Sequence, residues 1–170
     1  MRLEFMFTSG ARARPSFRGA SRAGARAARV TWLGVCVVLA LSCQEKSKEC
    51  QRFIGTVNKT LREIDARPQP KADDVAAVAA HRQALAEKYD ALAKDVTTLK
   101  LSEPALVDRA QRYSGLAKAA GSALTAGAQA LKAGDPKAAE ASQKQFDGVA
   151  QEEAALVREI NDLCLKDEKL

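Results

Sequence analysis

The chain has 170 residues, the length of one domain plus a leader, and a formal net charge of +6. This charge is confined to the N-terminus, because seven of the 27 Lys and Arg residues and one of the 21 Asp and Glu residues precede Cys43. From Cys43 onward 20 residues of each sign remain, so the net charge is zero and the basic balance gives no electrostatic case for nucleic-acid binding. We therefore expect no nucleic-acid partner.

Residues 1–42 have the parts of a secretory signal peptide. An n-region with seven arginines ends at Arg29, and twelve uncharged residues from Val30 to Leu41 follow it. A helix needs about 20 apolar residues to span a hydrocarbon core, so the pattern predicts cleavage after the small residue Ser42. The n-region is unusually long, which indicates either a tolerated extension or a translation start nearer to the apolar run.

The end of this leader, Ala40-Leu41-Ser42-Cys43, resembles the lipobox of bacterial lipoprotein precursors. The resemblance implies that the leader is cut before Cys43, that the Cys43 thiol carries a diacylglyceryl group, and that residues 43–47 form a short tether to the membrane. Most lipoboxes have leucine where this chain has Ala40, and the alternative is an ordinary signal peptide. By resemblance to the enterobacterial sorting rule, Gln44 favours the periplasmic face of the outer membrane over the inner membrane.

Cys50 and Cys164 are the cysteines that remain once Cys43 carries lipid. An even pair in an oxidising compartment favours a disulfide. Cys50 lies near the start of the first predicted helix and Cys164 near the end of the last, and these two points meet at one end of an up-down-up-down bundle. The alternative is two buried thiols that act as small apolar side chains.

The chain after Cys43 has no alternating strand pattern and is rich in helix-forming residues. It is interrupted at Pro68-Gln69-Pro70, at Ser102-Glu103-Pro104 and at Gly134-Asp135-Pro136. The last break combines a C-terminal glycine, a capping aspartate and a first-turn proline, and in the second Ser102 is the expected N-cap. These breaks predict helices at about 46–66, 73–100, 103–133 and 136–164, within a bundle of residues 48–165 and before a charged tail, 166–170.

Each predicted helix has one apolar face at helical spacing. The second helix shows it most regularly, in a heptad seam from Val75 to Leu99 that only Arg82 interrupts with a charge. Long helices joined by short breaks pack antiparallel. The sequence therefore predicts an all-α fold, an elongated antiparallel up-down-up-down four-helix bundle. The alternative is a three-helix coiled coil with a looser first helix.

Candidate chemical groups are few. His81 is the single histidine, both methionines precede the predicted cut, and no serine has a histidine at a related spacing. We therefore expect neither a metal site nor another cofactor, and we expect the protein not to be an enzyme. Arg82 and Glu153 are candidate polar seam positions. They could form a functional pair between the second and fourth helices, or Arg82 could extend to the core edge while Glu153 turns to the rim and Ala154 faces inward.

The sequence thus predicts a membrane-anchored cell-envelope lipoprotein whose helical bundle acts in binding, tethering or structural support. Its expected partner is the membrane, through the N-terminal lipid, and one alternative is a role as adaptor for another envelope protein. Carriage of a small apolar ligand within the bundle is the other alternative. The sequence leaves the oligomeric state open.

Overall fold

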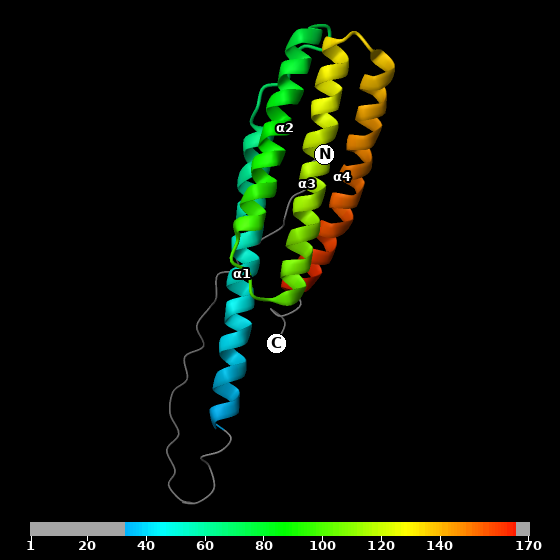
Figure 1. Ribbon diagram of the computed structural model, residues 1–170. Coiled ribbons are helices and arrows are strands. Elements are labelled where there is room, and N and C mark those ends of the chain that lie inside the picture. The colour runs from blue at the N-terminus through cyan, green and yellow to red at the C-terminus, as the bar shows by residue number, and fades with distance from the viewer. Residues whose placement is uncertain (1–32, 166–170) are drawn as a thin grey trace, which may run out of the picture.

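The computed structural model describes the backbone from Leu33 to Leu165 and the side chains from residue 45 onward. The arginine-rich n-region, the side chain of Cys43 and the tail 166–170 lie outside the described residues. The described backbone forms four helices and no strand, which confirms the predicted all-α fold (Figure 1). The helices are α1 Leu33–Asp65, α2 Val75–Thr98, α3 Pro104–Lys132 and α4 Pro136–Leu165.

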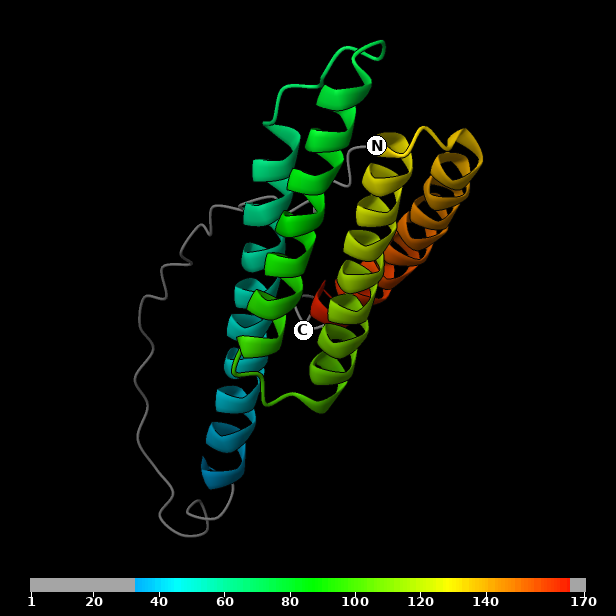
Figure 2. The ribbon, with the colours of Figure 1, turned by 45° about the horizontal axis from the view of Figure 1, so that its top comes forward.

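Successive helices run in opposite directions and form an elongated bundle (Figure 1 and Figure 2). The loops 66–74 and 133–135 lie at one end, which we call the distal end, and the loop 99–103 lies at the other. We call this second end the disulfide end, because Cys50 and Cys164 are joined there. α3 packs closely along both α2 and α4, while α1 contacts α2 and α4. The predicted four-helix topology is confirmed.

The breaks between helices follow the expected local chemistry. Asp74 caps α2, and its side chain accepts a hydrogen bond of 2.9 Å from the backbone N–H of Ala77. Before α4, Gly134 has a φ of +67°, and the Asp135 side chain accepts a hydrogen bond of 3.0 Å from the N–H of Ala138. The predicted bounds of α2, α3 and α4 agree with the structure within two residues.

The first helix is longer than predicted. It begins at Leu33 rather than near residue 46 and passes through Cys43 without interruption. No proline or glycine occurs between Val35 and Ile54, so nothing in the backbone ends the helix there. Residues 43–47, expected as a tether, are therefore helical. Among the described helices, none is both long enough and apolar enough to span a membrane.

Large apolar side chains fill the disulfide end of the bundle. α1 contributes Phe53 and Val57, which are fully buried, so this helix is an integral part of the core and the three-helix alternative is wrong there. The ring of Phe53 meets that of Tyr113 edge to face, with centroids 5.7 Å apart. α3 instead buries a row of small side chains, which lets it approach α2 and α4 closely; they include Ala117, Ala120, Ala123 and Ala128.

Candidate functional site

Polar and covalent contacts at the disulfide end join α1 to the other helices. The bond between Cys50 and Cys164 links α1 to α4, with the two Cα atoms 5.8 Å apart. The predicted pairing of Cys50 with Cys164 is confirmed. The two cysteines meet because the up-down-up-down order brings the end of the last helix beside the first. The link closes a sequence separation of 114 residues.

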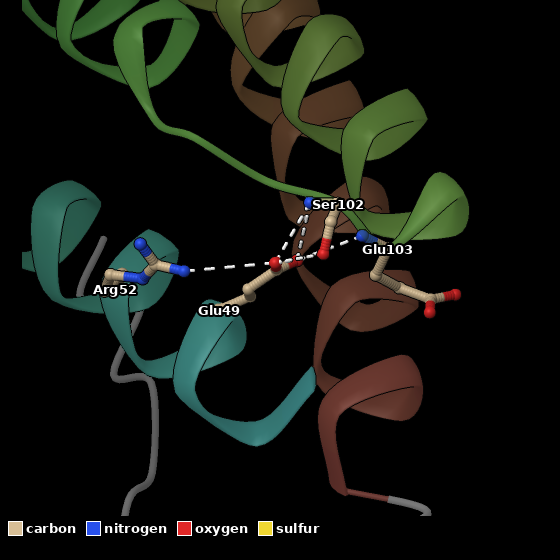
Figure 3. A network of polar contacts seen from close by, with 4 residues as sticks. All are labelled: Glu49, Arg52, Ser102 and Glu103. Atoms are coloured by element: carbon tan, nitrogen blue, oxygen red, sulfur yellow. Dashed lines mark hydrogen bonds and ion pairs between the residues drawn. The ribbon is translucent and has the colours of Figure 1, made fainter. Parts of the chain in front are cut away.

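Glu49, one residue before Cys50, makes the second connection (Figure 3). Its carboxylate accepts hydrogen bonds of 3.0 Å from the N–H groups of Ser102 and Glu103 and one of 2.6 Å from the Ser102 hydroxyl. Glu103 is the N-cap of α3 but makes no side-chain capping bond. The prediction that Ser102 caps α3 is therefore wrong, because Glu49 of α1 accepts from the donors at the start of α3 instead.

The environment of Glu49 favours its charged form. The side chain is only 4% exposed, and this burial raises its pKa. The hydrogen bonds from Ser102 and Glu103, with the Arg52 guanidinium 3.9 Å away, outweigh burial, so the pKa of Glu49 lies below its ordinary value. Our sequence reasoning missed this residue, although it lies four residues before Phe53 and so continues the apolar face of α1.

Glu153 lies inside the bundle, not at its rim. It is 9% exposed, and the Tyr113 hydroxyl of α3 donates a hydrogen bond to its carboxylate. Burial raises the pKa of Glu153, although the hydrogen bond from Tyr113 acts in the opposite direction. Burial, and then the nearby Glu153 charge, raises the pKa of Tyr89 to about 12. The expectation that helix four turns Ala154 inward in place of Glu153 is wrong, because Tyr113 supplies the donor that the buried carboxylate needs.

Arg82 makes its contact far from Glu153. Its Nη2 donates a hydrogen bond of 2.9 Å to Oε1 of Gln143, and Gln143 in turn donates one of 2.9 Å to Asp147. A Cβ on Gly127 would lie 2.5 Å from Nη1 of Arg82, so the glycine makes room for the arginine to cross α3 towards α4. The structure does not bring Arg82 and Glu153 together as a pair. Arg82 instead links α2 to α4 near the distal end.

The remaining chemistry of the described residues is sparse. Within residues 45–165 no three His, Cys, Asp or Glu side chains are grouped so that they could hold a metal ion. No family model, curated protein or solved structure matches the chain. Function must therefore be inferred from the residues themselves. The best-defined site is the disulfide end, where Glu49 and Cys50 attach the helix that contains Cys43 to both α3 and α4.

Proposed function

We propose that the chain is a lipid-anchored protein of the bacterial cell envelope whose bundle acts by binding or tethering and not by catalysis. The Cys50–Cys164 disulfide is the observation that carries the proposal, because such bonds persist in oxidising compartments and are rare in the cytosol. The disulfide supports export from the cytoplasm. The lipobox-like stretch that ends at Cys43 supports acylation of the exported chain. Two or more acyl chains on one residue make an anchor stable, where a single chain is marginal.

The position of Cys43 in α1 gives the anchor a mechanical role. Cys43 precedes Cys50 by seven residues of continuous helix, which corresponds to about 10 Å along the axis. Cleavage before Cys43 leaves helix and no loop between the acylated residue and the attachments at Glu49 and Cys50. The disulfide end would therefore lie close to the lipid surface, and the distal end would project away from it.

Binding at the protein surface is favoured over carriage of an apolar ligand. The alanines of α3 are buried at contacts between helices, so close packing occupies the space that a carrier would need. An apolar hollow beside Val96 and Leu101 has about 180 Å³, below the usual range of ligand pockets. A larger groove of about 420 Å³ between α1 and α2 contains the ion pair of Lys88 with Glu63, which does not suit an apolar molecule.

Metabolic labelling with an alkyne-bearing fatty acid tests the anchor. We expect the wild-type chain to be labelled and to sediment with membranes, and Cys43→Ser to lose both properties. Cys36→Ser is the matched control, since it removes a cysteine from the same apolar run and should leave labelling and sedimentation unchanged. Retention of label by Cys43→Ser, or its loss in Cys36→Ser, would contradict the proposal.

A further inference from the structure

Large side chains in the middle of the central seam are fully covered, whereas those towards the distal end are only partly covered, as is Leu99 at the start of the loop 99–103. On α2, Leu92 is 0% exposed and Val96 is 2% exposed, whereas Val78 and Leu85 on the same seam are half-buried. α4 shows the same change, since Leu156 and Ile160 are buried while Phe146 is half-buried. Large apolar seam side chains are thus covered in the middle of the bundle and partly uncovered towards the distal end, where the small Ala79 and Ala86 are buried.

The early end of α1 accounts for this difference. α1 stops at Asp65, and its last turns lie level with Lys88, which forms an ion pair of 2.6 Å with Glu63. α2 continues from that level to Val75, a further length of about 20 Å. Figure 1 shows α1 ending short of the distal end of α2. The distal part of the bundle therefore has three helices and the loop 66–74, where the disulfide end has four helices.

The side chains left without a fourth helix form one face, which we call the distal face. It comprises Val78, Arg82, Leu85, Tyr89, Gln143 and Phe146. The rings of Tyr89 and Phe146 meet edge to face with centroids 6.1 Å apart and form its boundary with the covered core. Within residues 45–165 no carboxylate forms an ion pair with Arg82, whose hydrogen-bond partner is the neutral amide of Gln143. The distal face thus combines apolar and aromatic side chains with a half-buried positive charge.

We propose that the distal face binds an amphipathic helix of another envelope protein, which lies in line with α1 and places a carboxylate against Arg82. A helix fits because the uncovered seam continues the position that α1 occupies lower in the bundle, over a length of about 13 residues. The acidic residue follows from charge complementarity, since a half-buried guanidinium is best paired with a carboxylate. A second copy docked through the same face would bring two Arg82 side chains together. This proposal rests on the binding role proposed above and names its partner class.

Site-specific photocrosslinking in the native cells tests the distal face. A benzoylphenylalanine is introduced at Leu85 in the full chain, and at Glu87 as the matched control, because Glu87 is exposed on the same helix. We expect an adduct from Leu85 and none from Glu87, with the crosslinked peptide lying in an amphipathic helix that contains Asp or Glu. Arg82→Glu should lower the yield at least about tenfold and Arg82→Lys should preserve it. Arg82→Gln should also lower the yield while its circular dichroism spectrum stays unchanged, which attributes the loss to the missing charge and not to a change of fold.

Every other result overturns the proposal. An adduct of twice the chain mass would identify a second copy as the occupant, and an adduct extracted by organic solvent would identify lipid. Equal yields at Leu85 and Glu87, no adduct, or an unchanged yield in Arg82→Glu would each show that the face is not a docking site. Acylation of Cys43 is scored separately, so failure of the anchor and failure of docking give different results.

Discussion

Replacing Glu49 with glutamine tests whether α1 is attached to the start of α3. The amide retains one acceptor oxygen, but its NH₂ group would face the N–H donors of Ser102 or Glu103. A hydrogen bond to a charged group contributes about 1.5–3 kcal/mol, and loss of an N-terminal cap costs about 1 kcal/mol. Ser102 is exposed and water can replace part of what is lost. We therefore expect Glu49→Gln to lower the free energy of unfolding by about 2–3 kcal/mol.

Urea unfolding of the purified chain in mild detergent, followed by circular dichroism, measures this difference. Glu45→Gln is the matched control, because Glu45 is exposed one turn earlier in α1 and its loss should change the stability by less than about 0.5 kcal/mol. The pKa of Glu49 is lowered in the folded state, so its contribution is present above pH 4.5 and is lost as the pH falls through the folded pKa. The curves of Glu49→Gln and wild type should converge in acid. Equal stability of the two at pH 7 would refute the reasoning.

Three further changes give distinct results in the same unfolding assay. Burial raises the pKa of Glu153 in the folded state. The wild-type chain should therefore lose stability relative to Glu153→Gln as the pH rises from 4.5 through the folded pKa. A stability difference that stays constant with pH would show that the carboxyl is not desolvated. Gly127→Ala should lower the free energy of unfolding by about 1 kcal/mol, because the added Cβ displaces Arg82. Gly115→Ala has open space around it and should raise the free energy of unfolding by about as much. A change of the same sign in both variants would contradict the packing. Reduction of the Cys50–Cys164 bond should cost at most about 4–5 kcal/mol, and no change in the urea midpoint would show that the bond does not constrain the unfolded chain.

Features that depend on neighbouring residues in the sequence were predictable. Gly134 and Asp135 act on their own backbone, so the last break and the start of α4 follow directly from their chemistry. The Cys50–Cys164 pairing was predictable from the order of the helices, because that order brings these residues to the same end of the bundle. Neither prediction required knowledge of any side-chain rotamer.

Features that depend on a partner from another helix were not predictable. Nothing local shows that Glu49 accepts from the start of α3, since that contact requires the register between α1 and the loop 99–103. Burial of a carboxylate looks unfavourable until Tyr113 is placed opposite Glu153. The start of α1 at Leu33 differs from the prediction for another reason, because the predicted cleavage site carries no backbone signal that would begin a helix there.

These polar contacts also explain how an alanine-rich bundle keeps a single register. Ala79, Ala86 and Ala93 of α2 are buried and lie seven residues apart, so a slip of one heptad against α3 would place alanine on alanine with little loss of packing. The contact of Tyr113 with Glu153 and that of Arg82 with Gln143 do not repeat at this spacing. A slip of α2 by one heptad, about 10 Å, would separate Arg82 from Gln143. A slip of α3 against α4 would separate Tyr113 from Glu153 and leave that buried carboxyl without its donor, which costs more than the loss of an alanine contact. The polar residues of the seam therefore select one alignment of α2, α3 and α4.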